Sequence, residues 1–399
     1  MRRIGVVTTS RSDYSSLLPL LRLISDDPEL ELLLFVGGMH LLPEYGSSIR
    51  EIEGDGFPIA DRVQMLLASN TREAVAKSIG LGVMACAESF SRFRPDLLLI
   101  VGDRFELLSV ACAALPLAIP IAHVSGGDAT EGLIDNQVRY AVTKLSHLHF
   151  VAMESHAQRL LQMGEEPWRV HVTGDPALDL IRQIRVLSRE ELAASLHVAL
   201  EPPVVVVTMH PTTLGSYSVL EEVSALLAAL SRVPGTLIFT YPNADPESRT
   251  IIEHTRAFTT QRPGAALFFN LGQQRYYSLL THADLMVGNS SSAAWEAPTF
   301  RLPAVNIGER QRGRLSVGNV IHAAVDAHAI ERAIRRGMDP AFRASLRDLQ
   351  NPYGDGHAAP RIVGAIKDVE RGPVLLQKRF HSFVSQPVFE HAGPPSVAL

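Results

Sequence analysis

Several residues that could transfer protons follow directly after short apolar runs of this chain. Asp103 follows the run PDLLLIV and a glycine, and the segment GGDATEGLID contributes Asp128, Glu131 and Asp135. Carboxylates that lie close together shift one another's pKa values and can serve as general acids and bases. His210 follows the Val-rich run 203–208, where its imidazole could transfer a proton or contact a phosphate.

Each of these residues also has an ordinary structural explanation. Asp103 could cap a helix over 104–118, and His210 could be a hydrogen-bonded structural histidine. The carboxylates of GGDATEGLID could bind a metal ion. That segment has no histidine at ligand spacing, however, and H-E-x-x-H is absent from the chain, so we expect no metal site.

A second kind of site is indicated by the segment GNSSSAAWEAP, in which Ser290 and Ser291 precede an expected helix start. Free backbone N–H groups and the helix dipole favour phosphate at such a position, although a serine there can also simply cap the helix. Arg11, Arg310 and Arg314 could neutralise a diphosphate, or could be ordinary solvated charges.

The elements that must position these residues alternate between short apolar runs and longer segments of helical period. This pattern is typical of an α/β protein with parallel sheets covered by helices. We expect one series of strands at 4–9, 31–36, 97–101, 119–124, 149–152 and 170–173, and a second at 204–208, 237–241, 266–269, 285–287 and 304–307. Ligands of parallel sheets bind beyond the carboxyl ends of the strands, so both series direct polar residues into one cleft.

Composition excludes several classes of protein. The 399 residues are 46% hydrophobic and 20% charged with a formal charge of -5, which fits a folded protein of about two domains and argues against a nucleic-acid binder. Two cysteines and the absence of a signal-peptide core or membrane span predict a cytoplasmic protein. G-x-G-x-x-G after the first strand and G-x-x-x-x-G-K-[ST] are both missing. These residues alone therefore indicate an α/β enzyme acting on a phosphorylated or nucleotide-linked small molecule.

Ordered motifs add a family resemblance that covers residues 4 to 371. The blocks SRSDY, GDRFE, HVSGGDATEGLID, RYAVTKLSHLHF, HPTT, YPNAD, GNSSSAAWEAP, VNIGERQRGR and NPYGDG resemble the UDP-N-acetylglucosamine 2-epimerase family, and in particular its hydrolysing branch. The resemblance implies two Rossmann-like domains facing across a cleft, the glycosyltransferase B arrangement. We place these domains at 1–180 and 181–357, a helix returning to the first domain at 358–372, and a flexible tail at 373–399.

The resemblance also implies a reaction and a set of site residues. Such enzymes eliminate UDP from UDP-N-acetylglucosamine to give a 2-acetamidoglucal, then add water to release N-acetylmannosamine, a sialic acid precursor, without metal or redox cofactor. A homodimer is implied as well. The catalytic candidates are Asp103, Glu131, Asp135 and His210, and the substrate-binding candidates are Arg11, Arg104, Asp128, Ser290, Ser291, Glu296, Arg310 and Arg314.

The chain departs from the family pattern at positions that bear on the sugar. Ser125 stands where many relatives carry a glutamate, whose role Asp128 or Glu131 could take, and Tyr140 and Trp295 replace other residues. These changes leave a UDP-2,4-diacetamido-2,4,6-trideoxyhexose as an alternative substrate and a non-hydrolysing epimerase as an alternative reaction. From other functional classes, a UDP-sugar glycosyltransferase and a non-catalytic nucleotide-sugar sensor also stay open.

Overall fold

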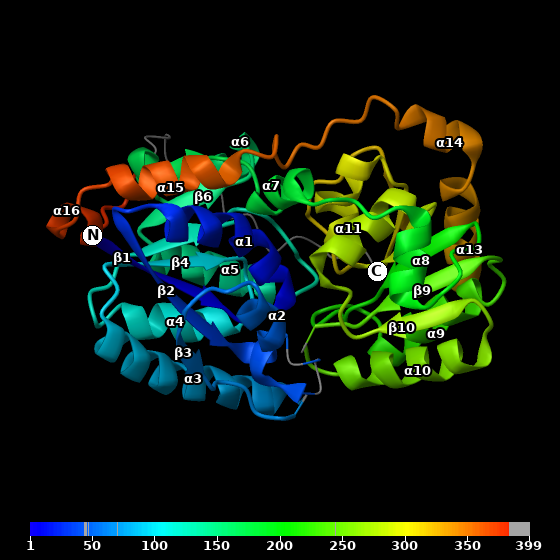
Figure 1. Cartoon of the computed structure of the whole chain (residues 1–399), viewed down its shortest axis with the longest axis horizontal. Helices are drawn as coiled ribbons and strands as arrows, with labels where there is room; N and C mark the ends of the chain where they lie inside the picture. Colours follow the sequence, from blue (N-terminus) through cyan, green and yellow to red (C-terminus); the bar gives the residue numbers. More distant parts are fainter. Residues whose placement is uncertain (44–45, 47, 70, 244, 383–399) are drawn as a thin grey trace, which may run out of the picture.

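Two parallel β-sheets, one from each half of the chain, form the framework of the computed structural model (Figure 1). The structure describes residues 1–399 except 44–45, 47, 70, 244 and 383–399. The first sheet has the strand order β3-β2-β1-β4-β5-β6-β7 and the second the order β10-β9-β8-β11-β12-β13, with every neighbouring pair parallel. The strands are β1 (Arg2–Thr8), β2 (Leu30–Gly37), β3 (Ile59–Val63), β4 (Leu97–Val101), β5 (Ile121–Val124), β6 (Leu148–Val151), β7 (Val170–Val172), β8 (Val204–Thr208), β9 (Thr236–Thr240), β10 (Ala265–Phe268), β11 (Leu285–Gly288), β12 (Ala304–Ile307) and β13 (Val320–Ala323).

The central strands are continuous apolar runs because helices cover both faces of each sheet. Every residue of LLLIV in β4 and of VVVVT in β8 is buried, and the α/β class expected from the sequence is confirmed. Two edge strands, β3 and β13, were not predicted from the sequence. In IADRV of β3 only Val63 is buried, so this strand carries no apolar run to reveal it.

Helices fill the connections between the strands. Thr71 caps the longest of these helices, α3, its side chain accepting a hydrogen bond from the backbone N–H of Ala74. Within the described part of the chain, no helix is long and apolar enough to span a membrane. The α-helices are α1 (Arg11–Asp26), α2 (Ile49–Gly54), α3 (Arg72–Phe93), α4 (Glu106–Ala114), α5 (Asp135–Leu145), α6 (Glu154–Gln162), α7 (Pro176–Gln183), α8 (Arg189–Leu196), α9 (Val219–Leu230), α10 (Ser248–Gln261), α11 (Gly272–His282), α12 (Ser292–Trp295), α13 (Ala327–Gly337), α14 (Pro340–Ser345), α15 (Ala358–Asp368) and α16 (Pro373–Leu376).

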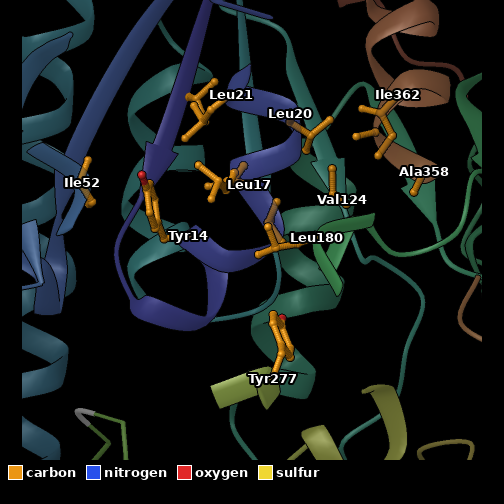
Figure 2. Packing of buried hydrophobic residues seen from close by; sticks show 14 of the residues in the cluster. Tyr14, Leu17, Leu20, Leu21, Ile52, Val124, Leu180, Tyr277, Ala358 and Ile362 are labelled. Carbon is orange, nitrogen blue, oxygen red and sulfur yellow. The ribbon is translucent and has the colours of Figure 1, made fainter. Parts of the chain in front are cut away.

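One hydrophobic cluster joins the start of the chain to its end. Leu17, Leu20 and Leu21 of α1 lie beside Leu180 of α7 and Ile362 of α15, and all five side chains are buried (Figure 2). The chain thus passes through the second half as far as α14 and then returns over the first sheet as α15 (Figure 1). This return agrees with the position that we expected for the helix near residue 358.

The segment after residue 372 corrects one of our expectations. Leu375 is buried, and the guanidinium of Arg169 donates to the carbonyl oxygens of Val374, Leu375 and Gln377 at 2.8 to 3.1 Å. These contacts hold α16 against the first domain, so residues 373–382 do not belong to the flexible tail that we expected. The rest of the expected tail, 383–399, lies outside the described residues.

A candidate active site between the two sheets

A single pocket lies where both sheets reverse their strand order. The reversals fall between β1 and β4 in the first sheet and between β8 and β11 in the second, and ligands of such sheets bind at these points. The polar residues that follow these strands come together there from both domains. The pocket is lined by ten of our candidates, Arg11, Asp103, Arg104, Asp135, His210, Ser290, Ser291, Glu296, Arg310 and Arg314.

Asp103 is held at the pocket by a buried arginine. Its carboxylate accepts a hydrogen bond from Nη2 of Arg139, and the same guanidinium donates to Oγ1 of Thr130 at 3.1 Å and to the carbonyl oxygen of Asp128 at 3.0 Å. The alternative role of Asp103 as a helix cap does not apply, because α4 begins at Glu106 without a side-chain cap. Arg139 belongs to the block RYAVTKLSHLHF, but nothing in its sequence context predicted this contact.

Asp135 lies in the first turn of α5 and has an unusual protonation equilibrium. Burial raises its pKa to about 7, and the negative charges of Asp103 and Asp245 act in the same direction, against the opposing effect of Arg104 and Arg310. A carboxyl group with such a pKa can both give and take a proton at neutral pH. The carboxylates that act on Asp135 are thus Asp103 and Asp245, which come from other segments than GGDATEGLID.

His210 is fixed by two residues of the second domain. Its backbone N–H donates to Oδ1 of Asn289 at 2.7 Å, and its carbonyl oxygen accepts from Nδ2 of the same residue at 2.8 Å. The backbone N–H of Asn243 donates to Nδ1 of the ring at 3.1 Å, which places the proton of the neutral imidazole on Nε2. Burial, followed by the positive charge of Arg310, lowers the pKa of His210 well below 6.5. The ring is thus a neutral hydrogen-bond donor.

The serine segment follows a glycine that no other residue could replace without strain. Gly288 has φ +138°, and a Cβ atom there would lie 1.9 Å from the carbonyl oxygen of Thr208. Beyond it, Oγ of Ser290 accepts from the backbone N–H of Ser292 at 3.3 Å, as its alternative role in a helix start predicts. Ser291 makes no such cap bond. Both hydroxyls nevertheless line the pocket.

Burial shifts the pKa values of three further ionisable side chains that line the pocket. Burial lowers the pKa of Arg11 to about 10 and also lowers that of Arg310, which donates to the carbonyl oxygen of Asn289 at 3.1 Å. An anion in the pocket would compensate the desolvation of these two guanidinium groups. Burial raises the pKa of Glu296 to about 7, so this carboxyl can also donate a hydrogen bond near neutral pH.

Two of our candidates lie outside the pocket. Glu131 has a side chain that is 52% exposed and forms an ion pair of 2.9 Å with Arg312, so we withdraw the catalytic role that we expected for it. Asp128 is buried behind the lining, where its Oδ2 accepts from Nε of Arg314 at 2.7 Å. Asp128 therefore supports a lining residue instead of facing the substrate.

Arg104 and Ser125 also have partners within the protein. The two terminal nitrogens of Arg104 pair with Glu106 and Asp245, each at 3.2 Å. The hydroxyl of Ser125 donates to Asp175 at 3.3 Å and does not line the pocket. Among the described residues, no three His, Cys, Asp or Glu side chains are grouped so that they could hold a metal ion.

Comparison with known proteins identifies the family. The model of the UDP-N-acetylglucosamine 2-epimerase family matches residues 22–367. This chain belongs to that family. It is 38% identical, over 82% of its own length and 85% of the relative's, to a Campylobacter jejuni enzyme named GDP/UDP-N,N'-diacetylbacillosamine 2-epimerase (hydrolysing). It is 32% identical to a Legionella pneumophila UDP-N,N'-diacetylbacillosamine 2-epimerase (hydrolysing), and 30% identical to a Neisseria meningitidis UDP-N-acetylglucosamine 2-epimerase, each over 95% of this chain and 99% of theirs.

Solved structures of this 2-epimerase family have the same fold. A Neisseria meningitidis UDP-GlcNAc 2-epimerase bound to UDP-GlcNAc superposes with a TM-score of 0.77 over 92% of this chain and 100% of that one, at 15% identity. A Listeria monocytogenes protein of the family gives 0.76 over 92% and 95%, at 17% identity. The two-domain arrangement that the resemblance implied is confirmed, and the chain is an enzyme of the 2-epimerase family.

Proposed function

We propose that this enzyme is a hydrolysing 2-epimerase that converts a UDP-linked 2-acetamido sugar and water into UDP and the free 2-epimer. The observation that carries the proposal is the meeting of Asp103, Asp135 and His210 in one pocket between the domains. The carboxyl group of Asp135, whose pKa is raised to about 7, beside the carboxylate of Asp103 suits the removal and return of the proton at C2. A neutral imidazole donor and buried arginines suit a departing diphosphate.

The reaction has two steps. In the first, one carboxylate of the Asp103 and Asp135 pair takes the proton from C2, the C1–O bond breaks, and its electron pair leaves with UDP. His210 donates from Nε2 to the departing diphosphate, whose charge Arg11 and Arg310 offset. In the second step, the other carboxyl group delivers a proton to the opposite face of C2 of the 2-acetamidoglucal, and water adds its hydroxyl to C1. The proton that this water loses passes to the carboxylate that has just delivered its own, and the proton taken from C2 in the first step is released to solvent, so both carboxyl groups return to their starting states. All atoms of the substrate and one water are then accounted for.

The sugar that we favour is a 2,4-diacetamido-2,4,6-trideoxyhexose, the alternative that the sequence left open. Its support is the relatives at 38% and 32% identity, whose names specify N,N'-diacetylbacillosamine. UDP-N-acetylglucosamine is the second candidate, supported by the Neisseria relative at 30% identity. Both sugars carry the 2-acetamido group and the UDP leaving group that the two steps require.

A proton and phosphorus NMR time course in deuterated water tests reaction and substrate together. Each UDP-sugar is supplied separately, and we expect free UDP and a free 2-epimer deuterated at C2, faster from the diacetamido sugar. A UDP-linked epimer as product would replace hydrolysis by the non-hydrolysing reaction. If neither sugar releases UDP, the proposed function is wrong.

A further inference from the structure

A buried ion pair joins the two domains beside the pocket, which Arg104 lines. Nη1 of Arg104, which follows β4 of the first sheet, lies 3.2 Å from Oδ1 of Asp245, which follows β9 of the second. Both side chains are about nine-tenths buried. The sequence predicted that Arg104 binds substrate. Its terminal nitrogens are instead taken by two carboxylates of the protein, Asp245 and Glu106.

Each residue of this ion pair lies close in the chain either to a catalytic candidate or to a residue that contacts one. Arg104 directly follows Asp103 in the chain. Asp245 is two residues from Asn243, whose backbone N–H donates to Nδ1 of His210 at 3.1 Å. The pair thus connects the carboxylate that could act on the sugar with the imidazole that could act on the diphosphate, although the two come from different domains.

We propose that the Arg104–Asp245 ion pair is a latch that aligns Asp103 with His210 when the domains close, which makes Asp245 a positioning residue for the reaction. This role deepens the proposed function and rests on it. Neither residue of the latch needs to touch the reacting atoms. What they fix is the position of one catalytic group relative to another, and small misplacements of such groups cost large factors in rate.

The partners of Arg104 explain why the contact can act as a latch. Glu106 lies on the same domain and is 1% exposed, so it holds the guanidinium in place whether or not the domains meet. Asp245 comes from the other domain, so its contact with Arg104 requires that the two domains meet. Because a charge that is buried without its partner is costly, the closed state requires that the contact be made with the correct geometry.

Two further ion pairs between the domains show what is specific to this one. Asp128 and Arg314 pair at 2.7 Å and are buried. The other contacts of the Arg314 guanidinium are with Gln311 and Trp295, neither of which is a catalytic candidate. Arg312 and Glu131 pair at 2.9 Å on the surface, with side chains 67% and 52% exposed. The second of these provides a matched control, since it spans the same interface away from the pocket.

The test compares Asp245→Asn with Arg312→Gln. We expect Asp245→Asn to lower kcat at least about tenfold while its UDP dissociation constant and melting temperature stay close to those of the wild type. Arg312→Gln should leave all three close to the wild type, because exposed ion pairs contribute little. Arg104→Lys keeps a charge beside Glu106 but loses the planar fork, and it should repeat the pattern of Asp245→Asn.

Small-angle X-ray scattering with saturating UDP separates the latch from the proposed function. Asp245→Asn should retain a larger radius of gyration than the wild type, because its domains close less often. The latch is refuted if Asp245→Asn keeps the wild-type kcat and radius of gyration. It is also refuted if Asp245→Asn and Arg104→Lys lose kcat only in proportion to a loss of UDP affinity or of stability. If the wild type releases UDP from neither sugar, the proposed function fails, and scattering alone then decides whether the pair governs closure.

Discussion

Lys378, in the C-terminal segment, makes buried contacts whose loss should lower the free energy of unfolding by a predictable amount. Nζ of Lys378 lies 2.7 Å from Oε2 of Glu165, a carboxylate that is fully buried in the first domain and also accepts from Lys144 at 2.6 Å and His149 at 3.0 Å. Burial alone would raise the pKa of Glu165, but the hydrogen bond and charge of His149, together with hydrogen bonds from Lys144 and Lys378, outweigh it and hold the pKa at about 2.

This pKa sets the size of the effect. The difference from the ordinary value of 4.5 corresponds to about 3 kcal/mol of stabilisation at neutral pH, shared among three partners. Nζ of Lys378 also donates to the carbonyl oxygens of Lys144 at 3.0 Å and Ser146 at 2.5 Å, at the end of α5. Losing up to a third of the first contribution and roughly 1 kcal/mol from these carbonyls gives at most about 2 kcal/mol for Lys378→Met, because the burial that lowers the pKa of Lys378 itself offsets part of the loss.

Thermal unfolding measures this cost. For a domain of this size, about 2 kcal/mol lowers the melting temperature by roughly 4 to 8 °C, which circular dichroism resolves. Arg379→Met is the control, because it removes the same charge from the next, exposed side chain. Since folding depresses the pKa of Glu165, its stabilisation is complete above about pH 4.5 and is lost as the pH falls toward 2. Equal melting temperatures for the two variants at pH 7 would refute the reasoning.

Three further predictions concern the pocket. Asp103→Asn should bind UDP in calorimetry but lose turnover, because the phosphate-binding side is untouched; unchanged turnover removes this residue from the mechanism. Gly288→Ala should destabilise the second domain by at least about 3 kcal/mol in chemical denaturation, since its Cβ would meet Thr208, and a smaller loss would contradict that geometry. The rate should fall as the pH rises through about 7, where Asp135 loses its proton. This fall in rate should be absent from the pH profile of Asp135→Asn. It should persist in Glu296→Gln, which removes a different carboxyl group whose pKa is also about 7.

Local sequence was enough to predict the strands that are buried on both faces. VVVVT of β8 is apolar throughout because helices cover it on both sides, and its end marks the position of His210. The edge strand β3 carries no such signal, because most of its residues are partly exposed. The attachment of the segment after residue 372 was not predicted for a different reason. Its attachment depends on Arg169, about 200 residues earlier, and no local pattern records that contact.

The same distinction applies to the site. Polar residues at strand ends are visible in the sequence because the topology of a parallel sheet sends them to one edge, and most of those that we selected do line the pocket. Glu131 and Asp128 were the exceptions. A loop can turn a side chain outward, as at Glu131, or bury it behind the lining, as at Asp128, without any change of residue type. Arg139 and Asn289 were missed because their roles consist of contacts with residues distant in the chain or with backbone atoms.

The chemical role of a residue depends on its surroundings as well as on its type, so it is harder to predict from the sequence than its position. A histidine and an aspartate have the same ordinary pKa values wherever they occur, and the sequence alone could equally assign His210 as a base or as a hydrogen-bond donor. The backbone N–H of Asn243 and the surrounding positive charge decide between them, whereas burial and neighbouring carboxylates decide for Asp135. Asp245 of the second domain contributes to the raised pKa of Asp135 through its negative charge. The raised pKa of Asp135 is therefore a property of the two domains together, since Asp103 belongs to the first and Asp245 to the second.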